Sequence, residues 1–396
     1  MSRAADWDIV PLGTSEDLLG IERETWTERW VVGRGGFAAH SSANRTVWAA
    51  VDVGTVADLL SVFEPGSEQV WVGAGGGTVR YQNVGTWVDR SIPSGENFVL
   101  FSRNVGGALA VGDQGSIYRT SDYGQTWQPQ ASGVSVSLHA GGGFIDGPAW
   151  AVGDGGTIVY RSPGQPWTSQ VSGTSADLYG FAETPVGNVA VGELGTILRS
   201  TDQGTTWIAK GSGTTATLFA VSVAKNDFNV LYAAGAGGVV VKSTDRGETW
   251  CRLLTGDTTD FYAIEAVSHL EVFVAGAGGR MLRTINGGGP CTDPADVPEP
   301  ILSTRFELSA PWPQPSAGTV RFQLIGSTGS FDLAGEIRGQ VVDASGRLVL
   351  PPLDVERRTG DPIPIVVPGD RLPTGVYFLR VTGGGFTSTR RFLIVR

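Results

Sequence analysis

The sequence is poor in the residues that build disulfide frameworks and metal centres. Its 396 residues include only two cysteines and three histidines, too few for a disulfide scaffold or a Cys/His metal cluster. No run of 18 apolar residues occurs, so we expect no transmembrane helix. The first residues also lack the apolar segment of a signal peptide. We therefore expect no metal, no cofactor and no membrane span.

Positive charge is scarce over most of the chain. Residues 1–300 carry 18 basic and 31 acidic side chains, whereas residues 301–396 carry 11 basic and 8 acidic ones. Nucleic acids and anionic membranes are bound through basic surfaces. The acidic body of the chain therefore argues against nucleic acid as a partner.

Glycine is abundant, and it accompanies a repeat. The chain has 58 glycines and 12 tryptophans, a composition that favours many short strands joined by tight turns. A pattern of the form Val-Gly-x-x-Gly-x-Ile-x-Arg-Ser-x-Asp-x-Gly-x-Thr-Trp recurs in steps of 39 to 43 residues. Its seven copies are residues 32–48, 72–87, 111–127, 152–167, 191–207, 234–250 and 275–291.

A period of about 40 residues with four short strands in each unit is typical of a β-propeller. We predict an all-β, seven-bladed propeller over residues 1–291. The chain starts at the phase of a fourth strand, and the seventh unit stops before its own fourth strand. Residues around 6–12 are therefore predicted to complete blade seven, which would close the ring and remove two sheet edges.

Three repeats carry the full Ser/Thr-x-Asp-x-Gly-x-Thr-Trp pattern, known as the Asp-box. In this pattern the aspartate accepts backbone N–H bonds within a hairpin, and the tryptophan packs between sheets. We interpret six residues as structural: Asp122, Trp127, Asp202, Trp207, Asp245 and Trp250. Asp113, Asp154 and Glu193 share another repeat position; we expect solvated loop residues there, with a cation or sugar site as the alternative. No catalytic pair of carboxylates is evident.

The repeats, together with the opening Trp7-Asp8-Ile9-Val10, resemble the photosystem II stability/assembly factor-like propellers of the BNR/Asp-box and sortilin-like superfamily. Members of that family bind a protein through an arginine-rich face. The resemblance implies a candidate basic ring at one repeat position, with His40 and Tyr160 in the remaining two blades: Arg80, Arg119, Arg199, Lys242 and Arg283. The alternative is that these side chains hold the blades together through stacking and hydrogen bonds.

The tail differs in character from the repeats. Residues 292–303, rich in proline and acidic residues, are predicted to form a linker. Residues 304–396 are predicted to form a small Ig-like β-sandwich, with strands at 320–324, 336–342, 348–350, 363–367, 375–381 and 387–395. Segments 310–316, 342–347, 372–381 and 390–396 resemble the type A C-terminal sorting domain of the type IX secretion system.

The two cysteines occupy nearly equivalent places in adjacent repeats. Cys251 follows the sixth closing tryptophan and Cys291 replaces the seventh. Equivalent positions in adjacent blades lie on the order of 10 Å apart, too far for a disulfide without rearrangement. Cys291 ends the propeller and can move, so a disulfide stays open, and export would favour it.

We expect a monomeric, non-enzymatic binding protein at the bacterial cell surface or in the medium, with the periplasm as the alternative. It would bind a protein or glycan on a propeller face and meet the type IX machinery through its tail. One alternative is a secreted glycoside hydrolase of the sialidase-like superfamily. The other is a photosystem assembly factor proper, against which the tail argues.

Overall fold

The computed structural model describes two compact units, Met1–Pro298 and Glu299–Arg396. Within them it describes residues 6–23, 29–41, 47–66, 69–83, 85–102, 104–184, 187–291, 306–308, 319–326, 338–343, 347–351, 353–354, 363–383 and 386–394. The linker predicted over residues 292–303 lies outside these ranges. No helix among the described residues is long and apolar enough to cross a bilayer.

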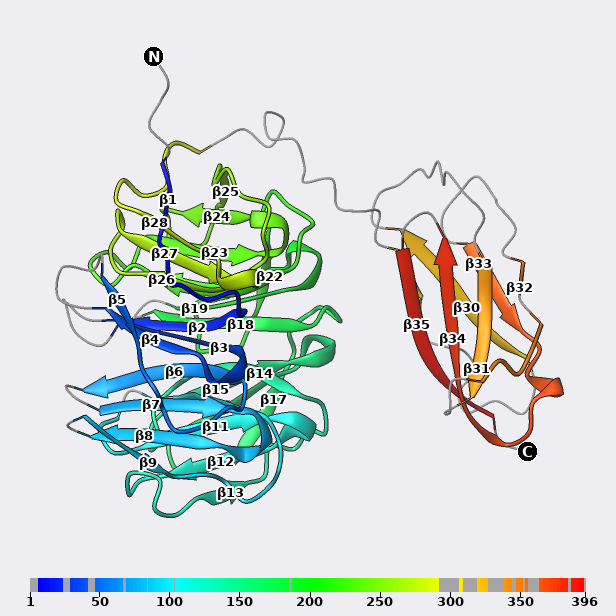
Figure 1. Cartoon of the computed structure of the whole chain (residues 1–396), viewed down its shortest axis with the longest axis horizontal. Coiled ribbons are helices and arrows are strands. Elements are labelled where there is room, and N and C mark those ends of the chain that lie inside the picture. The colour runs from blue at the N-terminus through cyan, green and yellow to red at the C-terminus, as the bar shows by residue number, and fades with distance from the viewer. Residues whose placement is uncertain are drawn as a thin grey trace. The chain divides into compact units, whose positions relative to one another are not determined.

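The first unit is a propeller of seven four-stranded antiparallel sheets (Figure 1). Blades 1 to 3 contain, from the first to the fourth strand, β2 (Leu18–Arg23), β3 (Arg29–Gly33), β4 (Ala38–Ser41) and β5 (Trp48–Ala50); β6 (Leu59–Gly66), β7 (Gln69–Ala74), β8 (Val79–Asn83) and β9 (Thr86–Asp89); β10 (Phe98–Phe101), β11 (Ala108–Gly112), β12 (Ile117–Thr120) and β13 (Gln128–Gln130). Blades 4 and 5 contain β14 (Leu138–Gly143), β15 (Ala149–Gly153), β16 (Ile158–Arg161) and β17 (Trp167–Gln170); β18 (Leu178–Thr184), β19 (Gly187–Gly192), β20 (Ile197–Ser200) and β21 (Ile208–Lys210).

Blade 6 contains β22 (Leu218–Val223), β23 (Leu231–Gly235), β24 (Val240–Ser243) and β25 (Cys251–Leu253). Blade 7 contains β26 (Phe261–Ala266), β27 (Val272–Gly276) and β28 (Met281–Thr284), with β1 (Asp8–Ile9) as its fourth strand. β1 pairs antiparallel with β28, Asp8 facing Arg283 and Ile9 facing Leu282. The predicted closure of the ring by the chain's beginning is therefore confirmed.

Each second strand turns into the third through a three-residue 3-10 turn. The seven turns are η1 (Arg34–Gly36), η2 (Gly75–Gly77), η3 (Asp113–Gly115), η4 (Asp154–Gly156), η5 (Glu193–Gly195), η6 (Ala236–Gly238) and η7 (Ala277–Gly279). The middle residue of each turn has a positive φ, a conformation that suits glycine. Five turns use glycine there, whereas η3 uses Gln114 and η5 uses Leu194.

The hydrophobic core lies between adjacent blades. The second strands are apolar and almost fully buried, because each is covered on both faces by a neighbouring sheet. Tryptophans in or just before the fourth strands join blades: the Trp87 ring of blade 2 lies 5.6 Å from Trp30 of blade 1, edge to face. Trp127 of blade 3 meets Trp71 of blade 2 in the same way, at 6.3 Å.

The second unit contains two antiparallel sheets. One has the order β29 (Phe306–Leu308), β30 (Val320–Gly326), β33 (Ile363–Val367), and the other β32 (Leu353–Asp354), β31 (Arg338–Asp343), β34 (Gly375–Gly383), β35 (Phe386–Ile394). Buried side chains from both sheets, such as Phe322 and Leu379, form one cluster. A further 3-10 turn, η8 (Gly369–Arg371), precedes β34. Residues 348–350 supply only a single bridge, from Leu348 to Val342, in place of the predicted strand.

Candidate functional site

The residues of the predicted basic ring lie on the third strands of their blades. One of them, Arg80, does not occupy the repeat position that the sequence predicted for it. In blade 2 the turn η2 begins at Gly75, three residues after Val72, whereas η3 begins at Asp113, two residues after Val111. Arg80 is therefore the counterpart of Tyr118, and Tyr81 holds the ring position. Arg80 instead donates from Nε to the Val53 carbonyl at 2.7 Å.

The other four ring residues contact neighbouring structure. Arg119 Nε donates to the Ile145 carbonyl of blade 4 at 3.0 Å, and its guanidinium also pairs with Asp146. Arg199 Nε donates to the Arg246 carbonyl of blade 6 at 2.7 Å. These contacts join each blade to the next.

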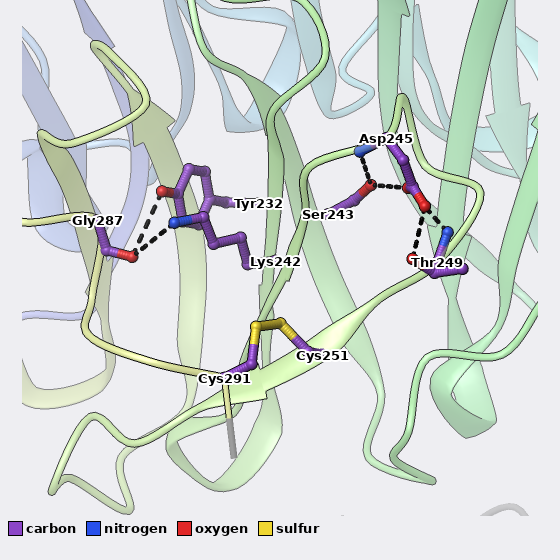
Figure 2. Close-up of a disulfide and its surroundings, with 8 residues drawn as sticks. All are labelled: Tyr232, Lys242, Ser243, Asp245, Thr249, Cys251, Gly287 and Cys291. Atoms are coloured by element: carbon purple, nitrogen blue, oxygen red, sulfur yellow. Dashed lines mark hydrogen bonds between the residues drawn. A yellow bond between two sulfur atoms is a disulfide. The ribbon is translucent and has the colours of Figure 1, made fainter. Parts of the chain in front are cut away.

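Of the last two ring residues, Lys242 also joins adjacent blades, whereas Arg283 pairs within blade 7. Lys242 Nζ donates to the Gly287 carbonyl at 3.2 Å and lies 5.3 Å from the Tyr232 ring centre (Figure 2). Arg283 Nη2 donates to Glu271 Oε1 at 2.7 Å. The described contacts thus use the ring mainly to hold the propeller together.

The three Asp-box aspartates share one hydrogen-bond pattern, drawn for Asp245 in Figure 2. Asp245 accepts from Ser243 Oγ at 2.8 Å, from Thr249 N–H at 2.9 Å and from Thr249 Oγ1 at 2.6 Å. Asp122 and Asp202 make the corresponding bonds. These donors are built into the hairpin, so the three carboxylates are committed to turn structure.

The hydrogen bonds lower the pKa of all three carboxyls. The Thr126 hydroxyl is the main cause at Asp122, and the Thr206 N–H is the main cause at Asp202. At Asp245, burial would raise the pKa, but the bonds from Thr249 outweigh it. Each motif tryptophan also donates from Nε1: Trp127 to the Arg90 carbonyl, Trp207 to Gln170 Oε1 and Trp250 to the Gly247 carbonyl.

Cys251 and Cys291 form a disulfide with their Cα atoms 5.5 Å apart (Figure 2). The repeat spacing had suggested a separation nearer 10 Å. Cys251 begins β25, whereas Cys291 lies beyond the last paired residue of β28, outside any strand. Freed from the sheet geometry of blade 7, Cys291 reaches across to blade 6. The disulfide joins the end of the propeller to its sixth blade.

The innermost strands end in a cavity of about 600 Å³ on the face where the Asp-box turns lie, which we name the Asp-box face. All seven first strands line this cavity. Three glycines, residues 141–143, line it on blade 4, and Gly141 allows the Phe101 ring of blade 3 to pack closely, since a Cβ there would clash with that ring. Lys225 Nζ lies 2.8 Å from Glu22 Oε1 and 2.9 Å from Glu265 Oε1, bridging blades 6, 1 and 7.

The charges of this cluster are set by its burial. Glu265 is almost completely buried, and this desolvation raises its pKa against the attraction of Lys225. Burial also acts to lower the pKa of Lys225, but the carboxylates of Glu22 and Glu265 more than compensate and raise it. The bridge crosses the ring closure, so it stabilises the propeller where its two ends meet.

The opposite end of the propeller, which we name the turn face, is formed by η1–η7 and the connections between blades. Those connections are residues 10–17, 51–58, 90–97, 131–137, 171–177, 211–217 and 254–260. At its centre a cavity of about 240 Å³ is lined by all seven first strands. The residue after the start of each first strand is half-buried there: Leu19, Leu60, Val99, His139, Tyr179, Phe219 and Tyr262.

Four of these residues form an aromatic arc across blades 4 to 7. The ring centres of His139 and Tyr179 are 5.1 Å apart, those of Tyr179 and Phe219 are 5.8 Å apart, and those of Phe219 and Tyr262 are 5.4 Å apart. We had not singled out the arc from the sequence. The 40-residue steps from His139 to Tyr179 to Phe219 were the signal that could have found it.

The acidic repeat position lies beside this arc. His139 Nε2 is 2.5 Å from Asp154 Oδ1, and the Tyr179 hydroxyl is 3.5 Å from Glu193 Oε1. Asp113 accepts hydrogen bonds from the backbone and the side chain of Asn97. Burial, and then the charge of Glu193, raises the pKa of Tyr179. Among the residues described, no group of three or more His, Cys, Asp or Glu side chains is placed to hold a metal ion.

Known structures share the propeller fold. No protein-family profile matches the sequence, and no curated protein matches it. A solved structure of "YCF48 bound to D1 peptide" is 21% identical with a TM-score of 0.60, covering 72% of this chain and 98% of that one. YCF48 from Cyanidioschyzon merolae is 20% identical with a TM-score of 0.58, covering 74% and 99%.

A third structure extends over nearly the whole chain. PorZ, described as an essential bacterial surface component of the type IX secretion system of Porphyromonas gingivalis, is 14% identical with a TM-score of 0.52. The match covers 94% of this chain and 58% of that one. These likenesses establish the fold, an all-β seven-bladed propeller, and they agree with the propeller part of the family resemblance drawn from the repeats.

Proposed function

We propose that the protein is an exported, non-enzymatic scaffold that binds a protein partner through one face of its propeller. Its C-terminal unit would act as a type A sorting domain that routes the chain to the cell surface or the medium through the type IX machinery. The single observation that carries the binding proposal is how the motif residues are used. The Asp-box carboxylates and all five cations of the predicted ring are engaged within the propeller, which leaves the loop faces as the surface for a partner.

Two of the similar structures support the choice of a protein partner and of export. YCF48, which has the same fold, was solved with a peptide bound. PorZ is a surface component of the secretion system in question. The disulfide supports export independently, because both cysteines of the chain are paired and disulfides persist in oxidising compartments.

Export is tested by terminal-peptide mass spectrometry of the native protein from cell, surface and culture fractions. We expect the protein outside the cell, with its tail cleaved between about residues 292 and 310, within or near the predicted linker. An intact tail ending at Arg396 in a strictly intracellular protein would contradict the sorting-domain proposal.

Binding is tested by cross-linking the full chain on cells and identifying the captured proteins, with a parallel assay on a panel of glycans. We expect a protein to be captured and no glycan to be hydrolysed. Turnover of a glycan would support the glycoside hydrolase alternative instead. A defect in photosystem II after deletion of the gene would favour the assembly-factor alternative.

A further inference from the structure

The turn face carries many acidic residues and few basic ones. Its seven connections and seven turns, together with Arg280 next to η7, contain eleven Asp and Glu residues and only three arginines. The Asp257 side chain is only 6% exposed, whereas the other ten acidic residues are partly or fully exposed. Two of the arginines are already paired with acids of the same face, Arg34 with Asp17 and Arg280 with Asp257. The face therefore presents a surplus of negative charge around the central cavity.

Apolar side chains are exposed on the same face over blades 4 to 6. Val171 is 87% exposed, Leu194 is 66% exposed and Leu254 is 53% exposed. Two hollows of about 460 and 500 Å³ lie beside them, lined by Val171 and Leu194 respectively. Together with the aromatic arc, this sector offers apolar contact area next to carboxylates.

Leu194 adopts a backbone conformation that is unfavourable for a leucine. Its φ is 55° at a turn position where five of the other six blades use glycine. A left-handed conformation disfavours a residue with a Cβ, and exposure to water gives the leucine no compensating burial. Glycine would serve the turn at least as well, so the side chain has no evident structural purpose.

We propose that the turn face over blades 4 to 7 binds an extended, basic peptide segment of the partner protein. Asp260 lies in the connection before β26, where its Oδ1 accepts a hydrogen bond from the Gly237 N–H. Lysine or arginine side chains would meet Asp154, Glu193 and Asp260, and would lie over the aromatic arc as cation–π partners. Apolar side chains of the segment would cover Leu194 and enter the adjoining hollow. The occupant is inferred from charge complementarity, and the inference rests on the proposed function as a protein-binding propeller.

The test begins with a display library of random dodecapeptides selected on the immobilised full chain. We expect the selected peptides to be rich in Lys and Arg with interspersed apolar residues, and to bind more weakly as salt is raised. Binding of the best peptide is then measured by fluorescence anisotropy against four variants of the full chain.

Leu194→Gly and the double variant Asp154→Asn/Glu193→Gln should each weaken binding by about tenfold, the effect of losing one central contact. The melting temperature of Leu194→Gly should be unchanged or higher, so that loss of binding cannot be attributed to misfolding. Gln114→Gly relieves the same turn conformation in blade 3, away from the arc, and should leave binding unchanged. Phe228→Ser, at a half-exposed position on the Asp-box face, should also leave it unchanged.

The outcomes separate this inference from the proposed function. If selected peptides are neutral or acidic, or if only Phe228→Ser weakens them, the turn-face inference is wrong while a protein-binding propeller stands. If no peptide is retained but a glycan array binds, both are wrong. If nothing binds in either assay, the turn-face inference is overturned as well.

Discussion

Blades 3, 5 and 6 hold their outer hairpins together from within, whereas blade 4 uses residues from elsewhere in the chain and blade 7 combines local and distant contacts. In blade 5, Ser200, Asp202 and Thr206 supply every bond of the Asp-box. Blade 4 has Arg161 at the corresponding start of its turn. Blade 7 has Asn286, which accepts hydrogen bonds from Thr284 Oγ1 and the Gly288 N–H within the hairpin and also donates to Asp6. The difference teaches that one hairpin shape can be stabilised by local or by distant contacts, and only the local kind leaves a motif in the sequence.

Blade 4 lacks an Asp-box, and Arg161 takes over the stabilisation of its outer hairpin. Its side chain is buried, and Nη2 lies 2.8 Å from the carbonyl oxygens of Phe144 and Ile145 and 3.4 Å from that of Gly147. The guanidinium also lies 5.2 Å from the centre of the Trp167 ring. One buried cation thus satisfies the carbonyls of an inner connection and supports the outer hairpin at once.

The largest effect is expected in blade 7, where the disulfide fixes the end of the ring. Reduction, or the double variant Cys251→Ser/Cys291→Ser, should lower the free energy of unfolding by about 4 kcal/mol, from the chain entropy of a loop of about 40 residues. Urea unfolding of oxidised and reduced protein measures it. Equal midpoints for the two forms would mean that blade 7 is held by its strand pairing alone.

Arg161→Ala should cost about 3 kcal/mol, because three carbonyl oxygens lose a charged donor inside the protein. Arg161→Lys should recover only part of this, since an ammonium cannot span the same carbonyls while stacking on Trp167. Both are compared with wild type by urea unfolding. If Arg161→Ala lowered the free energy of unfolding no more than an Asp-box variant does, distant contacts would not stabilise a hairpin more than local ones.

Asp245→Ala should cost about 1 kcal/mol, because the lost bonds are local and partly exposed to water. Asp245→Asn, which keeps one acceptor oxygen, should cost less. Thermal unfolding of both variants measures the order. Should Asp245→Ala destabilise the protein more than Arg161→Ala, the local motif would be the stronger of the two devices.

The smallest expected effect is on the way in which the stability of the protein depends on pH. Hydrogen bonds lower the pKa of Asp122, Asp202 and Asp245, so their stabilisation is present above the unfolded pKa, about 4, and is lost as pH falls through the lower folded values. Unfolding midpoints are measured from pH 6 to 2 for wild type and for the triple Asp→Asn variant. The two curves should converge toward low pH, and parallel curves would show that these carboxylates do not titrate with unfolding.

The sequence predicted the ring of seven blades and its closure because a fixed period and a fixed strand phase are carried by every repeat. Prediction failed where the repeat is irregular. In blade 2 the run Gly73-Ala74-Gly75-Gly76-Gly77 matches the repeat motif in a register that is one residue too early. This register assigned Arg80 to the ring position. The role of Arg161 was not predicted, because its partners are backbone carbonyls of a neighbouring connection. Such partners require no particular side chains and so produce no sequence motif.

The candidate surface was also only partly predictable. The acidic repeat position was found, but the aromatic arc was not, since its residues differ in kind and lie at the start of apolar strands that resemble ordinary core. The disulfide separation was overestimated because Cys291 was assumed to follow sheet geometry, although it lies beyond β28.

Pairing of β1 with β28 has a kinetic consequence. Asp8 and Arg283 lie at opposite ends of the propeller sequence, so their contact can form only after all seven blades have been synthesised. Until then, the open edges of β28 and of β1 are sites at which an incomplete ring could pair with another chain. The Cys251–Cys291 disulfide lies just beyond β28, so once formed it holds the end of blade 7 to blade 6 beside this junction.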